Sequence, residues 1–177
     1  MALVKDRRLF ELLEEHGERL IESRFQVPGA AEEVLDRSIH GMLEELQPNL
    51  WEEQLERLVD FGHTFSPALE MRALPSLLHG EAVTIDMAFS TALSVGRGLV
   101  SNAEATRVLD TMSALRLPTS HELCRPEFLW QALEEAVDHR DGLQRMPLPM
   151  GIGDVSFVND LQPAEISDAV AWLADRR

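Results

Sequence analysis

Two histidines, His63 and His79, are the side chains of this chain best suited to chemistry. Each stands beside a glycine, in the segments Phe61-Gly62-His63-Thr64 and Leu78-His79-Gly80-Glu81, and they lie sixteen positions apart. Neutral imidazole nitrogens are good ligands for zinc-like divalent ions, so two rings held close together can share one metal. Each glycine also lets the backbone or a ligand approach closely, because it has no side chain.

The two rings cannot be neighbours on a single helix. Sixteen steps of about 100° put them roughly 160° apart around a helix axis, and Pro67 and Pro75 interrupt the segment between them. They can meet only where two successive helices fold back on each other. By spacing alone, a pair of helix-associated histidines is more often structural than metal-binding, so both interpretations stay open at this point.

A third metal ligand is not obvious in the sequence. A catalytic metal normally has three protein ligands and one open position. Glu70 and Glu81 lie near the histidines along the chain and are candidates. Either carboxylate could instead accept a hydrogen bond from a histidine and orient its ring.

Apolar residues recur at helical spacing along most of the chain, which predicts a mainly α fold. We expect helices at 9–24, from Pro28-Gly29 to about 46, at 79–96, from 101 or 102, at 126–138 and at 163–175. The helix at 79–96 carries few charges and should be the buried centre of the domain. Short apolar runs on both sides of Gly151-Ile152-Gly153 predict a small β-hairpin near the C-terminus. These glycines lack the full dinucleotide-binding fingerprint, so we assign them to the turn of the hairpin.

The composition narrows the class of protein. The length of 177 residues suits one domain, 1–177, with a real core. A formal net charge of −15 argues against a general nucleic-acid binder, because phosphate backbones need a basic surface. No apolar run approaches the roughly eighteen residues that span a bilayer, and charges from Lys5 onward do not fit a secretory signal. The single cysteine, Cys124, allows no internal disulfide. We therefore expect a cytoplasmic protein without nucleic-acid or membrane partners.

The two histidine motifs resemble the C-terminal metal-binding domain of the dehydroquinate synthase superfamily, the sugar phosphate cyclases. The resemblance rests on residues 61–65 and 78–83 and covers nearly the whole chain. Dehydroquinate synthases typically read Asn-Phe-Gly-His-Thr-Phe-Gly-His at the first motif, whereas this chain has Asp60 first, Ser66 seventh and Pro67 eighth. In these departures it is similar to the sedoheptulose 7-phosphate cyclases of the 2-epi-5-epi-valiolone synthase type. Four more segments fit that group: Glu70-Met71-Arg72, Ile85-Asp86-Met87-Ala88, Pro147-Leu148-Pro149 and Ile152-Gly153.

The resemblance implies a reaction and a set of site residues. In this family NAD⁺ transiently oxidises a secondary alcohol, phosphate is eliminated, the ketone is reduced again, and an intramolecular aldol step closes the ring. A divalent zinc or cobalt ion polarises the alcohol as a Lewis acid. By resemblance, His63 and His79 are metal ligands, Asp60 and His139 are catalytic, and Asp60, His139 and Arg140 bind substrate. Arg57 lies one residue out of register with the family's arginine, so we expect it on the surface.

The resemblance also implies missing parts. In the family, the third metal ligand is a glutamate in a Glu-x-x-Lys motif that stands just before a stretch like residues 1–6. The family's N-terminal NAD-binding domain, with its glycine-rich phosphate turn, is also missing from this chain. We therefore expect the C-terminal half of a phosphate-eliminating lyase, incomplete without its N-terminal half as a separate chain or missing segment. Its expected partners are that half, a sugar phosphate and a second copy in a homodimer.

Two alternatives remain open. One is the C-terminal domain of a 3-dehydroquinate synthase of unusual sequence. The other is a helical interaction module that has lost catalysis and binds metal weakly.

Overall fold

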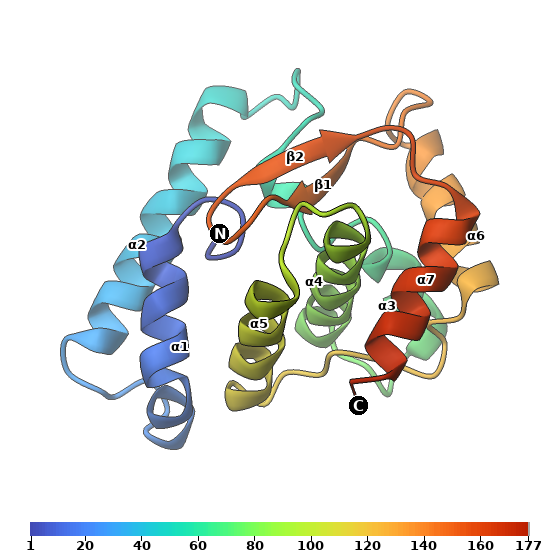
Figure 1. The fold of residues 1–177 in the computed structure, drawn as a ribbon. Helices are drawn as coiled ribbons and strands as arrows, with labels where there is room; N and C mark the ends of the chain where they lie inside the picture. The colour runs from blue at the N-terminus through green and yellow to red at the C-terminus, as the bar shows by residue number, and fades with distance from the viewer. Residues whose placement is uncertain (177) are drawn as a thin grey trace.

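The computed structural model describes residues 1–176, within which the chain forms seven α-helices and one two-stranded sheet (Figure 1). The helices are α1 (Arg7–Glu22), α2 (Ala30–Leu46), α3 (Ser66–Ala73), α4 (His79–Gly96), α5 (Asn102–Ala114), α6 (Pro126–Asp138) and α7 (Pro163–Ala174). The strands are β1 (Met146–Pro149) and β2 (Val155–Val158), and two 3₁₀ turns, η1 (Gln47–Asn49) and η2 (Leu58–Asp60), link α2 to α3. The expected mainly α fold with a hairpin near the C-terminus is confirmed.

Helix α4 is the centre of the fold. It contacts α3, α5, α7 and β1, and Figure 1 shows it running between α5 and α7. Eleven of its eighteen residues are buried, as its shortage of charged residues predicts. Phe89 of α4 packs edge-on against Phe65, with ring centroids 4.9 Å apart. This packing brings the segment before α3 onto the central helix.

Helices α1 and α2 form a pair to one side of the core, at the left of Figure 1. A separate small cluster of apolar side chains joins them: Leu9, Leu12, Leu20, Ala31 and Val34. Asp6 caps α1 by accepting from the Leu9 N–H at 3.0 Å, and Arg37 of α2 pairs with the same carboxylate at 3.0 Å. The other face of α2 stays exposed along a row of apolar side chains, which we call the α2 stripe: Leu35, Ile39, Met42, Leu43 and Leu46.

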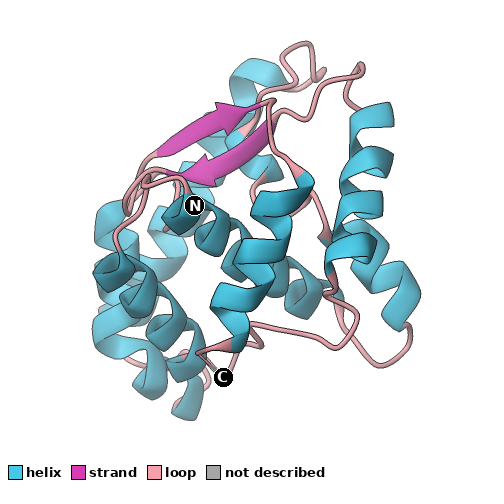
Figure 2. Ribbon diagram, turned by 45° about the vertical axis from the view of Figure 1, so that its right-hand side comes forward, coloured by secondary structure: helices cyan, strands magenta, loops and turns pink. Residues whose placement is uncertain are grey.

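The hairpin fastens the start of the chain to the core. Met146 pairs with Val158 and Pro149 with Val155 in antiparallel register, and Figure 2 shows both strands lying across one end of the helices, near the N-terminus. At the turn, the Gly151 N–H donates to the Leu99 carbonyl at 2.9 Å and the Gly153 N–H to the Leu3 carbonyl at 2.8 Å. The Gly-Ile-Gly segment is thus a turn, as expected.

The start of α5 and the apolarity of the helices can also be compared with the sequence. Ser101, rather than Asn102, caps α5, because its hydroxyl accepts from the Glu104 N–H at 3.2 Å. In residues 1–176, no helix combines the length and apolarity that crossing a bilayer would require.

Candidate metal and substrate site

The structure brings the rings of His63 and His79 together. Their centroids lie 5.6 Å apart, with the ring planes inclined at 48°. His63 lies in the turn before α3, and His79 is the first residue of α4, so the two helices do fold back on each other. Two imidazoles at this separation, one half-buried and one exposed at the surface, fit a shared divalent ion by the chemistry of their nitrogens.

The two candidate carboxylates have different roles in the structure. Glu70 of α3 reaches across to α4, with its Oε2 2.8 Å from His79 Nδ1, which leaves Nε2 of that ring for a ligand. Glu81 instead accepts from the Leu78 N–H at 2.8 Å and closes the first turn of α4. No group of three or more histidine, cysteine or acidic side chains that could hold a metal ion occurs within residues 1–176.

Gly62 lets the His63 turn lie directly on α4. Its φ of +85° is one that only glycine adopts readily, and a Cβ there would lie 2.9 Å from Met87 Cγ and 2.9 Å from Val83 Cγ1. The carbonyl oxygen of Val83 would be 3.2 Å away. Both requirements, the backbone angle and the space, point to glycine at this position.

Asp86 holds the same turn from inside the core. It lies on α4, is only 1% exposed, and accepts from the backbone N–H groups of Phe65 at 2.5 Å and Ser66 at 2.9 Å. The Ser90 hydroxyl donates to its other oxygen at 3.2 Å. Burial raises the pKa of the Asp86 carboxyl above its ordinary value, while these hydrogen bonds and the nearby His63 act in the opposite direction. Asp86 was not predicted as a site residue, because in the sequence it is only one acidic side chain within an apolar motif, Ile85-Asp86-Met87-Ala88.

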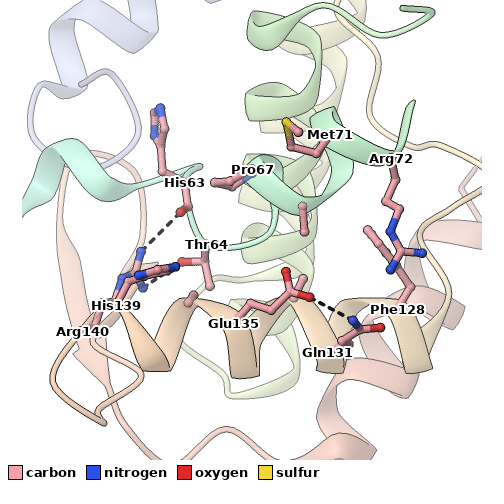
Figure 3. A pocket seen from close by; sticks show the side chains of 13 residues that line it. His63, Thr64, Pro67, Met71, Arg72, Phe128, Gln131, Glu135, His139 and Arg140 are labelled. Atoms are coloured by element: carbon pink, nitrogen blue, oxygen red, sulfur yellow. Dashed lines mark hydrogen bonds between the residues drawn. The ribbon is translucent and has the colours of Figure 1, made fainter. Parts of the chain in front are cut away.

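A cavity of about 370 Å³ opens beside His63, between α3 and α6 (Figure 3). Figure 3 shows His139 and Arg140 beside Thr64 at one end, and Arg72 with Phe128 at the other. The lining residues include His63, Thr64, Pro67, Met71, Arg72, Phe128, Glu135, His139 and Arg140. Of the predicted site residues, the structure therefore gathers His63, His139 and Arg140 around one space.

Arg140 is a largely buried cation, 9% exposed. Its guanidinium donates to Thr64 Oγ1 at 3.2 Å, to the His63 carbonyl at 3.4 Å and to the Gln144 carbonyl at 2.9 Å. All three of these acceptors are neutral oxygens. Burial lowers the pKa of Arg140 from its very high ordinary value, and the nearby carboxylate of Asp60 opposes that shift.

Asp60 lies next to this space but does not line the cavity. Its carbonyl accepts from the His63 N–H at 2.9 Å, so it belongs to the same turn. Its carboxylate takes two hydrogen bonds from Arg57, at 3.1 and 2.7 Å. Arg57, which we expected on the surface, has a side chain that is 23% exposed and that also pairs with Glu52, whose side chain is 63% exposed.

The family model described as 3-dehydroquinate synthase C-terminal matches residues 1–140. The chain belongs to this family. It is 59% identical, over 99% of its length, to a 2-epi-5-epi-valiolone synthase from Streptomyces hygroscopicus subsp. jinggangensis, and it spans 44% of that protein. A 3-dehydroquinate synthase from Corynebacterium pseudotuberculosis is 29% identical over 97% of the chain.

A solved structure of the Streptomyces hygroscopicus 2-epi-5-epi-valiolone synthase, with NAD⁺ and Zn²⁺ bound, is similar to this chain over nearly its whole length. It matches with a TM-score of 0.97 and 61% identity, covering 99% of this chain and 49% of that one. The chain thus spans somewhat less than half the length of this curated relative. The resemblance inferred from the paired histidine motifs is confirmed for the 3-dehydroquinate synthase C-terminal family.

Proposed function

We propose that this chain is the metal- and substrate-binding half of an NAD-dependent sugar phosphate cyclase. In this proposal it forms one C-terminal domain, 1–177, and the complete enzyme converts sedoheptulose 7-phosphate to a valiolone-type cyclitol in the cytoplasm, as a carbon–oxygen lyase. The observation that carries the proposal is the convergence of His63 and His79, 5.6 Å apart beside a cavity. The identity of 59% to a 2-epi-5-epi-valiolone synthase supports this reaction over that of 3-dehydroquinate synthase.

His63 and His79 would hold a divalent zinc or cobalt ion, which supplies Lewis-acid polarisation of a substrate hydroxyl when bound. Glu70 keeps the His79 ring oriented through its contact at Nδ1. The third ligand and most of the NAD site would come from an N-terminal half. Incomplete coordination should leave this domain alone with weak metal affinity.

Two side chains of this chain, Arg140 and His139, would bind the sugar phosphate. Arg140 and His139 lie together at one end of the cavity (Figure 3), in a protein whose net charge of −15 repels anions. The Arg140 charge is shielded from solvent, so salt screens it less than a surface charge. Asp60 would hydrogen-bond a substrate hydroxyl, and the two bonds from Arg57 fix the direction of its carboxylate.

The α2 stripe supports the proposed need for a partner. Its five exposed apolar side chains form a continuous row on one helix, and such rows commonly mark interaction surfaces. We propose the N-terminal half and a second copy, in a homodimer, as the partners of the complete enzyme.

The test is to join this chain to the N-terminal half of the Streptomyces hygroscopicus enzyme and measure NAD-dependent cyclisation. We expect turnover of sedoheptulose 7-phosphate with Zn²⁺ or Co²⁺, and loss of turnover in His63→Ala and His79→Ala. A panel of heptulose phosphates distinguishes a 3-dehydroquinate synthase. A folded two-half protein without turnover of any of them would contradict the proposal and favour the interaction module.

A further inference from the structure

We propose that Asp86 is a positioning residue of the metal site, which sets His63 opposite His79 through the backbone of the turn before α3. The inference rests on the proposed function, because it takes His63 and His79 as ligands of one ion. The hydrogen bonds of Asp86 go to the backbone N–H groups of Phe65 and Ser66 and to the Ser90 hydroxyl. Its carboxylate acts on the chain segment that carries His63.

The position of Asp86 along α4 fits this role. It follows His79 by seven residues, which at about 100° per residue returns to within roughly 20° of the same face of the helix. At 1.5 Å per residue it lies about 10 Å further along the axis. His79 stands at the exposed end of this face, with its side chain 62% exposed, while Asp86 is buried below it. One face of α4 thus presents both a ring and the carboxylate that fixes the other ring's segment.

The backbone that Asp86 holds is the start of α3. The N-terminal residues of a helix have N–H groups without helical partners, and a side-chain acceptor just before the helix usually takes them. Phe65 occupies that capping position and has no acceptor in its side chain. Asp86 supplies the missing acceptor from another helix, through the N–H groups of Phe65 and Ser66. Since His63 is only two residues before Phe65, fixing this start also fixes the His63 turn.

A second carboxylate makes the arrangement reciprocal. Glu70 of α3 reaches to the His79 ring on α4, while Asp86 of α4 reaches to the His63 turn at the start of α3. Each helix therefore carries a carboxylate that fixes the histidine at the start of the other helix. The direct packing of Gly62 on Val83 and Met87 leaves the turn no room to move toward α4.

The chemistry of a buried carboxylate argues against a merely space-filling role. A charged side chain inside a protein costs several kcal/mol unless donors compensate it, and apolar residues of similar volume often serve stability as well or better. Asp86 and Glu81 are the only charged residues in α4, and Glu81 lies at the helix start. A carboxyl group kept at the centre of such a helix is explained by the two N–H groups it orders, since a buried donor left without an acceptor costs free energy.

The test measures Co²⁺ affinity and the visible Co²⁺ absorption spectrum of the full chain joined to the N-terminal half. Asp86→Ala removes the acceptor, and we expect the affinity to fall about tenfold or more, as for other groups that orient metal ligands. Asp86→Asn retains an acceptor without the charge, and we expect a smaller loss of about threefold to tenfold. Ser90→Ala removes only the bond to the other oxygen and should change the affinity less than about threefold.

A stability control separates positioning from general loosening. Leu93→Ala removes a buried side chain of α4, 2% exposed, and should lower the melting temperature without changing the Co²⁺ spectrum. Wild-type affinity in Asp86→Asn would overturn the inference, and so would an equal loss of affinity in Leu93→Ala. If Asp86→Ala fails to fold, Asp86→Asn alone decides. If His63→Ala also keeps full affinity, the metal role itself fails, and with it the proposed function.

Discussion

Gly62→Ala tests the placement of the His63 turn on α4. The substitution adds one methyl group at a residue with φ of +85°. It should lower the free energy of unfolding and weaken metal binding together, because the turn can accept the methyl only by moving away from α4.

The size of the effect follows from two costs. A Cβ in the left-handed region costs about 1–2 kcal/mol. The new carbon would also lie 2.9 Å from Met87 Cγ and Val83 Cγ1, well inside the usual carbon–carbon separation, and overpacking of this kind costs about 1–3 kcal/mol. The sum is about 2–5 kcal/mol. For a chain of this size, each kcal/mol lowers the melting temperature by about 2–4 °C, so we expect a decrease of about 4–20 °C.

Gly96→Ala is the matched control. Gly96 is the last residue of α4, and a Cβ there would meet nothing within 4 Å. Because alanine favours a helix over glycine, this variant should be unchanged or up to about 1 kcal/mol more stable. Thermal unfolding followed by circular dichroism compares the two with wild type. Equal melting temperatures for Gly62→Ala and wild type would refute both the strain and the close approach.

Two more variants probe contacts across the fold. Glu70→Gln keeps the shape of the side chain but removes the charge beside His79 Nδ1, so Zn²⁺ affinity measured by calorimetry should fall about tenfold or more; Glu81→Gln should leave it unchanged. Arg97 donates a hydrogen bond of 2.7 Å to Glu165 and holds the pKa of that carboxyl below its ordinary value. The pair therefore stabilises the fold at neutral pH, and this contribution is lost as the pH falls through the lowered pKa. Arg97→Gln should therefore cost about 1 kcal/mol or less at pH 7 in urea unfolding, and less still near pH 3; a cost that grows on acidification would contradict this.

The fold could be predicted where local pattern decides it. An apolar run with almost no charged residues predicts the boundaries of α4. Short apolar segments on both sides of Gly151 and Gly153 predict the hairpin. The meeting of His63 and His79 required two helices to fold back, which the intervening prolines predict. The distance between the rings depends on how α3 packs on α4, and no spacing in the sequence determines that distance.

The carboxylates show where sequence reasoning stops. Glu81 stands three residues after Leu78, the capping position of α4, so its role could be read once that boundary is known. Asp86 is visible as a lone charge in an apolar helix, but its partners are backbone N–H groups about twenty residues away, and backbone groups have no sequence signature. The pairing of Arg57 with Asp60 could not be predicted, because it depends on a short 3₁₀ turn that a comparison of motif register does not describe.

The bond from Gly153 to Leu3 has a consequence for synthesis on the ribosome. Helices α1 and α2 are close in sequence and can pair while the rest of the chain is still being made. The carbonyl of Leu3, however, finds its donor only after about 150 further residues have been added. The core of this part of the chain therefore stays unfinished until the hairpin has been made, and a pause or premature stop before that point should leave it exposed to chaperones and proteases.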